Sequence, residues 1–366
     1  MNRILIIDPG KGWGQFVSKM YCFQKLAEYQ NSKIVFLTKR STQAEYYLRD
    51  TTFCDEVIYF DEPKKGIKNI INNIKSLLEN INKINKFNFK ACYVFHPSLR
   101  YLFIAKFSNI REIWGLGFKF QNFFLKKNKK FYSSFFSKTK GDNETLESVK
   151  KITHSNKIEY KPLSSIENSL RDTVGIIIAS SGKERRWSIE NYINVMQFLA
   201  EKNYKNFLII SGLDQSKDES LIKKKFRDSI DIVFTSDKKI SDVIPYLKKC
   251  KFCIGNDTGF SHLSVNLDIE TMIIQGDCPP QTYTSLIKNI DIDPFLVRSP
   301  TSIETIKTEK VLNELSKFLK RRGGRVVEGA RLESVCRGNP TVSSNLTLSA
   351  KTLNNLHTTL ERFSQS

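Results

Sequence analysis

The chain has 366 residues with a hydrophobic content of 40%, which is enough for two ordinary domains with buried cores. It carries 58 Lys and Arg against 38 Asp and Glu, and this net charge of +20 would suit nucleic acid, an anionic membrane surface or a phosphate-rich ligand. No apolar run approaches the ~20 residues of a membrane-spanning helix, and the N-terminus favours a strand over a secretion signal. We therefore expect a cytoplasmic protein. Because its lysines are spread along the chain without an RNA-binding motif, we expect no nucleic-acid partner.

In the first half of the chain, hydrophobic strands alternate with helical patterns. The expected strands are residues 3–8, 33–38, 56–60 and 91–95, and the expected helices are residues 16–29, a short one near Ala44, and 67–84. This order predicts a parallel, doubly wound α/β domain over residues 1–165. Residues 118–136 then alternate aromatics and lysines. The alternation is typical of a surface touching a membrane or lipid-linked acceptor, or of a helix that packs its aromatics inward, which we favour.

The polar residues 165–172 are interpreted as a linker, and a second alternating series follows it. The expected strands are residues 173–180, 205–211, 231–235, 251–255 and 271–276, and the expected helices are 189–201, 220–226, 240–249, a short one after residue 258, and 303–320. This series predicts a second α/β domain over residues 173–321. Two such domains usually face each other across a cleft, and ligands bind at the carboxyl ends of the strands.

Residues 323–366 lose the apolar periodicity and are expected to lack folded structure. One permitted set of codons for residues 342–347, VSSNLT, forms a perfect stem around the usual T-loop of a tRNA gene. We hypothesise that the reading frame runs through an adjacent tRNA gene here, which the nucleotide sequence of the gene tests.

The seven cysteines are an odd number without a framework spacing, which indicates free thiols. Cys250 and Cys253 form a C-x-x-C inside an apolar strand, whereas redox pairs lie at helix N-termini. We interpret both as core residues, and we expect no metal and no cofactor.

The stretch GNDTGFSH, residues 255–262, ends a strand on a carboxylate, a hydroxyl and a glycine. The tripeptide Asp257-Thr258-Gly259 also occurs in aspartic proteases, but those are all-β proteins, and we reject that interpretation. A strand-to-helix turn with Thr258 as N-cap is certainly part of the explanation. A helix N-terminus at this edge would also bind an anion, with Gly259 allowing a phosphate close to the backbone and His262 on the same helix face as Thr258. The stretch therefore predicts a diphosphate site.

A second stretch, IIIASSGKERRWSIENY over residues 176–192, also follows a strand. Three cationic side chains of this stretch can bind phosphate oxygens, namely Lys183, Arg185 and Arg186. A turn of this kind, taken alone, is more often simply exposed to solvent. In the same domain as the first stretch, it strengthens the prediction of a diphosphate. Arg185 is expected to be the main cation, and Asp214 or Glu219 to meet the ribose hydroxyls.

These residues together resemble glycosyltransferase family 9, the heptosyltransferases of lipopolysaccharide core synthesis. The family's Lys-Arg-Trp-Pro is similar to Arg185-Arg186-Trp187-Ser188, and its Gly-Asn-Asp-Thr/Ser-Gly-x-x-His matches residues 255–262. A Gly-x-x-Pro segment after a strand is similar to QGDCPPQTY, and residues 93–118 resemble the family's first-domain pattern more weakly. The resemblance covers about residues 1–320.

The resemblance implies a GT-B fold, with two Rossmann-like domains facing across a cleft. It also implies inverting, metal-independent transfer from a nucleotide diphosphate-sugar in the second domain to an acceptor in the first. The donor's sugar could be a heptose, and the acceptor a lipid-linked saccharide of the lipopolysaccharide core or a related cell-envelope glycan. A peripheral contact with the inner face of the cytoplasmic membrane is a further expectation. Asp291-Ile292-Asp293 matches the metal-binding Asp-x-Asp of other glycosyltransferases, but its place before Pro294 indicates an ordinary turn.

The glycine-rich loop after the first strand, DPGKGWGQF, departs from the family. The family places an Asp, thought to deprotonate the acceptor, where this chain has Gln15, and Gln cannot act as a general base. Asp8 and His96 are the other catalytic candidates. The alternative function is therefore a non-catalytic nucleotide-sugar-binding protein of the same fold. The predicted donor site comprises Lys183, Arg185, Asp214, Asp257, Thr258, Gly259 and His262.

Overall fold

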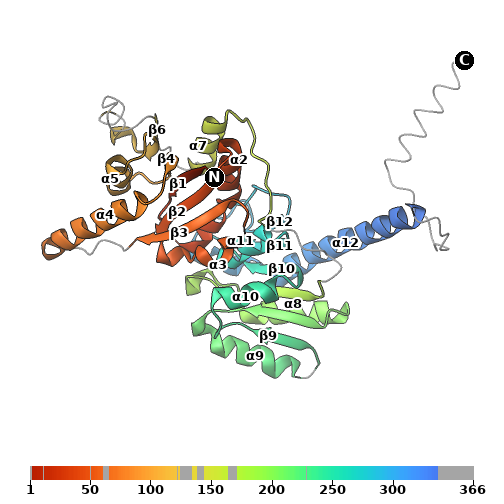
Figure 1. Cartoon of the computed structure of the whole chain (residues 1–366). Helices are drawn as coiled ribbons and strands as arrows, with labels where there is room; N and C mark the ends of the chain where they lie inside the picture. The colour runs from red at the N-terminus through yellow and green to blue at the C-terminus, as the bar shows by residue number, and fades with distance from the viewer. Residues whose placement is uncertain are drawn as a thin grey trace, which may run out of the picture. The chain divides into compact units, whose positions relative to one another are not determined.

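The computed structural model describes residues 2–10, 12–49, 51–60, 66–121, 123, 134–137, 144–163, 171–227 and 229–336. The chain divides into two compact units, Met1–Val311 and Leu312–Ser366, and both β-sheets belong to the first unit (Figure 1). Within the described residues, no helix is both long and apolar enough to cross a membrane.

The first sheet has six parallel strands in the order β3-β2-β1-β4-β5-β6. Its strands are β1 (Arg3–Ile7), β2 (Lys33–Lys39), β3 (Cys54–Phe60), β4 (Phe89–Val94), β5 (Glu112–Gly117) and β6 (Ser134–Ser137). The helices are α1 (Trp13–Val17), α2 (Met20–Gln30), α3 (Glu45–Leu48), α4 (Ile70–Ile84), α5 (Leu99–Phe107) and α7 (Glu144–Thr153). This is the doubly wound order that the sequence predicts, with its switch point between β1 and β4.

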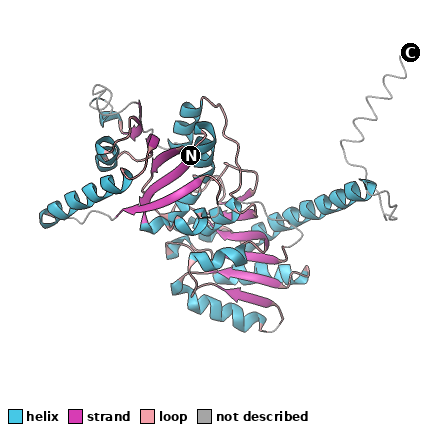
Figure 2. Ribbon diagram, in the orientation of Figure 1, coloured by secondary structure: helices cyan, strands magenta, loops and turns pink. Residues whose placement is uncertain are grey.

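The two faces of the first sheet are covered by different helices (Figure 2). Because side chains alternate along a strand, Ile4 and Ile6 of β1 face one core while Leu5 and Ile7 face the other. The core around Ile4 and Ile6 includes apolar residues of α1, α2, α3 and α7. The core around Leu5 and Ile7 includes residues of α4 and α5. The helices α4 and α5 thus form an outer layer of this domain.

The second sheet repeats the same plan, with six parallel strands in the order β12-β11-β10-β7-β8-β9. Its strands are β7 (Thr173–Ile177), β8 (Asn206–Ile210), β9 (Asp231–Phe234), β10 (Cys250–Asn256), β11 (Glu270–Gln275) and β12 (Ile287–Asp291). The helices are α8 (Ile189–Glu201), α9 (Ser216–Phe226), α10 (Ile240–Leu247), α11 (Gly259–Asn266) and α12 (Thr308–Cys336). Its switch point lies between β7 and β10.

The cysteine interpretation is confirmed for the strand that carries the C-x-x-C. Cys250 and Cys253 are fully buried free thiols, and burial raises the pKa of Cys250 well above its usual value. A buried protonated thiol packs as a small apolar side chain.

Two expectations about helices are wrong. The helix expected over residues 303–320 begins only at Thr308, after the 3-10 helix η6 (Pro300–Thr305), and α12 continues to Cys336. Residues 323–336 are therefore helical rather than unstructured, and Arg, Glu, Ala and Leu among residues 325–333 favour that state. Residues 337–366 lie outside the described residues, as does most of the expected linker, and the read-through hypothesis stays a prediction.

The second wrong expectation concerns residues 118–136. Phe118, Phe120 and Phe123 are exposed rather than packed inward. Residues 122 and 124–133 of this segment lie outside the described residues.

Candidate functional site

The main segments that the sequence singles out follow the four central strands of the two sheets. Asp8 and Gln15 follow β1, and His96 follows β4, which pairs with β1. Residues 183–186 follow β7, and residues 257–262 follow β10, which pairs with β7. Parallel strands end at the same edge of a sheet, so both groups lie at the switch points where doubly wound sheets bind ligands.

The turns after β7 and β10 are joined by the side chain of Asn256, which is completely buried. Its Oδ1 accepts hydrogen bonds from the backbone N–H of Trp187 at 3.1 Å and from the hydroxyl of Tyr192 at 2.8 Å. Its Nδ2 donates to the carbonyl of Ile178 at 2.8 Å. Asn256 therefore fixes the end of β10 against the turn that carries the cations.

Thr258 caps the helix α11, as the sequence predicts. Its hydroxyl accepts a hydrogen bond from the N–H of Phe260 at 3.2 Å, and its carbonyl accepts from the N–H of His262 at 3.2 Å. The hydroxyl of Ser261 donates to the carbonyl of Asn256 at 2.6 Å and tightens the same turn. The short strand-to-helix connection consequently holds Asp257 and His262 in a fixed relation.

His262 is nearly buried and has polar partners at both ring nitrogens. Its Nε2 lies 3.3 Å from Oδ1 of Asp257, and its Nδ1 lies 2.8 Å from the hydroxyl oxygen of Tyr283. Burial, and then the charge of Asp257, raises the pKa of Tyr283, so this hydroxyl keeps its proton and can donate it to Nδ1. The imidazole thus links a carboxylate to a tyrosine.

Tyr283 also packs against the first domain. Its ring stacks on Tyr21 of α2 with centroids 5.4 Å apart and an interplanar angle of 7°, and it lies 5.6 Å from the ring of Tyr160. The sequence stretch QGDCPPQTY contains Tyr283, but nothing local to it indicates that the ring reaches α2 and His262.

Gly259 contacts the first domain, and this alters its expected role. A Cβ at Gly259 would lie 2.4 Å from Cε2 of Trp13, and a Cβ at Gly14 would lie 2.9 Å from the Cα of Gly259. The ring of Trp13 meets Phe260 edge-on, with centroids 4.8 Å apart. The glycines at both positions are therefore explained by the close approach of α1 to α11, and a phosphate is not needed to account for Gly259.

The three predicted cations have different surroundings. Nε of Arg185 lies 3.0 Å from Oδ2 of Asp277, and its side chain is 45% exposed. Arg186 binds Asp214 through two contacts of 3.0 Å and donates to the carbonyl of Ser180 at 3.0 Å. Lys183 is exposed.

The bidentate pair with Arg186 lowers the pKa of Asp214. Asp214 consequently holds the turn after β7, and its expected contact with a ribose stays a prediction. Glu219, the other ribose candidate, accepts hydrogen bonds from Ser211 and from Ser236, whose hydroxyl lies 2.8 Å away.

The loop after β11 supplies two partners that the sequence analysis missed, Asp277 and Tyr283. Between them lies Cys278, whose pKa is raised to about 11 by burial and then by the charges of Asp257 and Asp277, while Arg185 acts in the opposite direction. The pKa of this one thiol is thus affected by three charged groups, which come from three different turns. The rule that ligand groups follow strand ends could have indicated Asp277, because it comes directly after the strand TMIIQG.

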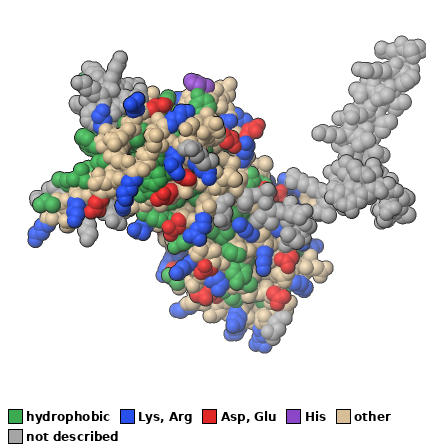
Figure 3. Space-filling model, in the orientation of Figure 1, with side chains coloured by type: hydrophobic (Ala, Val, Ile, Leu, Met, Phe, Trp, Pro, Cys, Tyr) green, Lys and Arg blue, Asp and Glu red, His purple; other side chains and the backbone are tan. Residues whose placement is uncertain are grey.

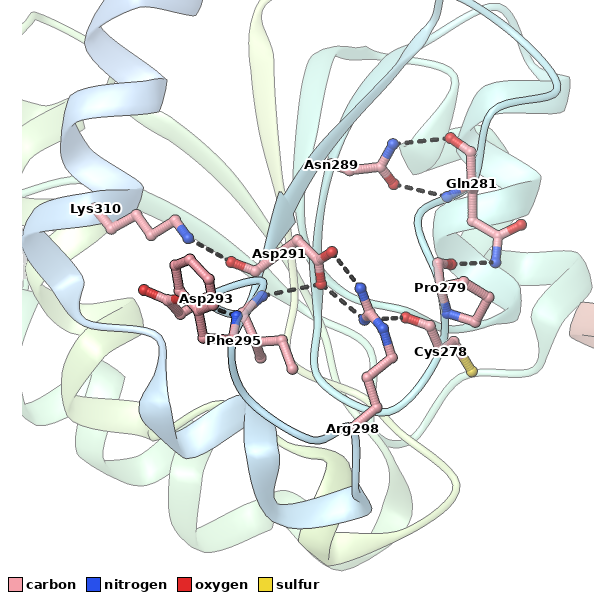
Figure 4. A network of polar contacts seen from close by, with 10 residues as sticks. Cys278, Pro279, Gln281, Asn289, Asp291, Asp293, Phe295, Arg298 and Lys310 are labelled. Atoms are coloured by element: carbon pink, nitrogen blue, oxygen red, sulfur yellow. Dashed lines mark hydrogen bonds and ion pairs between the residues drawn. The ribbon is translucent and has the colours of Figure 1, made fainter.

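Arg298 anchors this loop, as Figure 4 shows. Its guanidinium binds both carboxylate oxygens of Asp291 and donates to the carbonyl of Cys278 at 2.6 Å. The amide of Asn289 exchanges two hydrogen bonds with the backbone of Gln281, at 2.9 and 2.8 Å (Figure 4). Asp291 and Asp293 accordingly serve a turn, as expected. Across the residues that the structure describes, no group of three or more His, Cys, Asp or Glu side chains is placed to hold a metal ion.

Asp8 is a poor candidate for a general base. It is buried, its Oδ1 accepts from the N–H of Gly10 at 3.0 Å, and its Oδ2 lies 2.8 Å from Nζ of Lys19. Both oxygens therefore hold the glycine-rich loop. The carbonyl of Asp8 also accepts from the hydroxyl of Thr38 at 2.7 Å.

Gln15 and His96 remain as predicted candidates on the acceptor side. Gln15 is exposed on α1, next to the Gly14 that approaches Gly259. Nδ1 of His96 accepts a hydrogen bond from the N–H of Ser98 at 3.0 Å, and its ring lies edge-on to Tyr101. With Nδ1 accepting, the neutral ring carries its proton on Nε2 and presents a donor rather than a base.

Residues 129–297 match the sequence profile of glycosyltransferase family 9 (heptosyltransferase). No curated protein matches the chain by sequence.

Solved structures match the fold of nearly the whole described chain. A family 9 glycosyltransferase from Veillonella parvula has a TM-score of 0.69 at 15% identity, covering 87% of this chain and 98% of the other. The ADP-heptose lipopolysaccharide heptosyltransferase II of E. coli has 0.66 at 15%, covering 88% and 100%. E. coli heptosyltransferase WaaC with ADP-2-deoxy-2-fluoro heptose has 0.63 at 13%, covering 86% and 99%. These likenesses confirm the expected GT-B fold.

Proposed function

We propose that this chain, whose residues 129–297 match glycosyltransferase family 9, is a glycosyltransferase that moves a sugar from a nucleotide diphosphate-sugar to a lipid-linked saccharide of the cell envelope. The proposed donor is an ADP-heptose or a close analogue. Two E. coli relatives of the same fold support it, since one is named for ADP-heptose and the other contains an ADP-heptose analogue. The acceptor class follows from the name of the first, a lipopolysaccharide heptosyltransferase.

The observation that carries the proposal is the convergence of Arg185, Asp257 and His262 at the switch point between β7 and β10. Transfer leaves a nucleoside diphosphate, which gains negative charge as the glycosidic bond breaks. Fixed cations and hydrogen-bond donors at that point stabilise the transition state. Asp277 engages Nε of Arg185, and the phosphate would be bound through Nη1 and Nη2.

The N-terminus of α11 has a smaller part in this proposal than the sequence suggests. The N–H of Phe260 is engaged by the Thr258 cap, and Gly14 closely approaches the nitrogen of Gly259. We therefore assign the diphosphate chiefly to Arg185 and to the Asp257–Thr258 turn, with Lys183 contributing long-range charge. His262, held by Asp257 and Tyr283, would contact the sugar or the phosphate next to it.

The proposed transfer is inverting and independent of metal. An inverting displacement needs a group that takes the proton of the acceptor hydroxyl. Asp8 is engaged with Lys19, Gln15 has no suitable chemistry, and the tautomer set by Ser98 makes His96 a donor. We therefore propose that the base is a group that comes within reach only when the acceptor is bound.

The test has two arms. Thermal unfolding is measured with ADP, GDP, UDP and CMP, and ADP at 100 times its Kd is expected to add about 2.7 kcal/mol to the free energy of unfolding. Release of ADP from ADP-heptose in the presence of a lipid-linked core saccharide is then measured. Stabilisation without release would favour a non-catalytic nucleotide-sugar-binding protein, and stabilisation by none of the nucleotides would contradict the donor site.

A further inference from the structure

The outer surface of α4 carries a stripe of exposed apolar side chains. Ile71, Ile74 and Leu78 are 80%, 52% and 54% exposed. Their spacing of three and four residues places them on one face of the helix. Ile81 and Ile84, further along the same apolar face, are buried in the core, so this face of α4 continues from the core into solvent. A helix that only packed on its sheet would bury the whole of its apolar face.

Exposed aromatics continue this feature on neighbouring segments. The rings of Phe103 and Phe107 in α5 stack with centroids 6.1 Å apart, and Phe107 is 62% exposed. Phe118 and Phe120, which follow β5, stack at 6.0 Å, and Phe120 is 68% exposed. Helices α4 and α5 lie on the same face of the first sheet (Figure 1). We call the exposed apolar residues of α4, α5 and residues 118–123 the outer surface.

The described segment that carries the outer surface is basic. Residues 66–121 contain 9 Lys and Arg against 2 Asp and Glu, a net charge of +7. This net charge arises mainly because the segment has few acidic residues, while lysines occur along the whole chain, as expected. Lys75 and Lys83 are exposed on α4, and Lys119 is exposed between the two stacked phenylalanines. Figure 3 shows Lys and Arg side chains beside hydrophobic ones at the end of the molecule where Figure 1 places α4.

We propose that the outer surface docks on an anionic lipid bilayer. Exposed Ile, Leu and Phe side chains gain by entering the acyl boundary, while lysines beside them attract anionic headgroups. A nucleic acid would use the charge but not the apolar stripe. A second copy of the chain would bring two surfaces of net positive charge together. The bilayer is the partner that uses both properties at once.

This proposal extends the proposed function, because docking would place the enzyme where a lipid-linked acceptor is found. Its test does not depend on that function, since vesicle binding is measured without donor or acceptor. A protein that binds vesicles but not ADP would leave the docking surface standing and overturn only the donor site.

The experiment measures flotation of the full chain with phosphatidylcholine vesicles, with and without about a third of phosphatidylglycerol, at about 0.1 M salt. The apolar variant is Ile71→Ser/Ile74→Ser/Leu78→Ser, and the charge variant is Lys75→Glu/Lys83→Glu. The matched controls change exposed residues of the second domain. The apolar control is Leu213→Ser/Phe295→Ser/Val297→Ser, and the charge control is Lys224→Glu/Lys225→Glu. Circular dichroism checks that each variant is folded.

Wild type and both controls are expected to bind the anionic vesicles and not the neutral ones. The apolar variant should bind at least about tenfold more weakly, and each lysine reversed should weaken binding about fivefold or more. Wild type that fails to bind anionic vesicles would overturn the proposal. A folded apolar variant that binds like wild type would also overturn it. So would a control variant whose binding weakens as much as that of its matched variant, because the contact would then be a diffuse attraction between charges. Tighter binding of a short RNA under the same conditions would assign the surface to nucleic acid.

Discussion

The hydroxyl of Tyr283 lies 2.8 Å from Nδ1 of His262, and the other ring nitrogen of this histidine lies 3.3 Å from Asp257. A histidine held at both nitrogens cannot rotate, so its orientation is set by the loop after β11 as well as by its own helix. That loop is fixed in turn by Arg298. The geometry of the candidate donor site therefore depends on residues up to about forty positions away along the chain.

Changing Tyr283→Phe should lower the free energy of unfolding by about 1 kcal/mol, because the ring is kept while one buried hydrogen bond is lost. The matched control is Tyr160→Phe, since the buried Tyr160 hydroxyl has no hydrogen-bond partner among the described residues and its removal should be neutral or stabilising. Urea unfolding of both variants measures the difference. Equal effects at the two positions would mean that the contact with His262 contributes nothing.

Changing His262→Ala should cost about 2 kcal/mol of stability, because it leaves the carboxylate of Asp257 and the hydroxyl of Tyr283 without their shared partner. Donor affinity, measured per folded molecule by calorimetry, should also fall. A histidine that served the core alone would give the loss of stability with donor affinity intact.

Changing Gly259→Ala should destabilise the protein by about 1–3 kcal/mol, because the new methyl group would overlap the ring of Trp13. The double variant Gly259→Ala/Trp13→Ala should recover part of that loss, which a double-mutant cycle measures. If the glycine is instead required by a phosphate, the stability cycle shows no coupling, and donor affinity falls equally with and without Trp13.

Changing Arg185→Ala should weaken ADP binding by about ten- to hundredfold while adenosine binding is unchanged, because charged hydrogen bonds to the diphosphate are lost. Arg186→Ala is the comparison, since Arg186 is engaged by Asp214 and Ser180 and should affect stability more than affinity. Titration calorimetry with both ligands distinguishes them. A loss of adenosine binding as large as that of ADP would show that Arg185 acts through the fold.

The pair Arg186–Asp214 should give a pH-dependent contribution to stability. The folded protein lowers the pKa of Asp214, so this contribution is present above the carboxyl's unfolded pKa, near 4, and is lost as the pH falls through the lower folded pKa. The Asp214→Asn variant should therefore be less stable than wild type at pH 7, and the difference should shrink as the pH falls below about 4. A difference that is the same at pH 7 and at pH 3 would contradict the ion pair. The effect should be small, because Asp214 is about half exposed.

The sequence by itself determined the parts that depend on neighbours along the chain. Alternating apolar runs predicted the strands and helices of both doubly wound sheets. The rule that ligand groups follow strand ends predicted Arg185, Asp257 and His262 as candidate donor-site residues, which stays a prediction. Thr258 could be recognised as an N-cap because a cap is a contact between residues two positions apart.

Only the tertiary structure decided what depends on groups distant in sequence. It paired Arg186 with Asp214, His262 with Tyr283 and Gly259 with Trp13, each a contact across 21 to 246 positions. It also left Ile71 and Phe120 in solvent, although a pattern of apolar residues predicts burial. Periodicity shows that a helix has an apolar face, but the element that packs against this face decides whether it is buried. The physical reason is that the hydrophobic effect depends on the apolar area removed from water, and not on the order of residues along the chain.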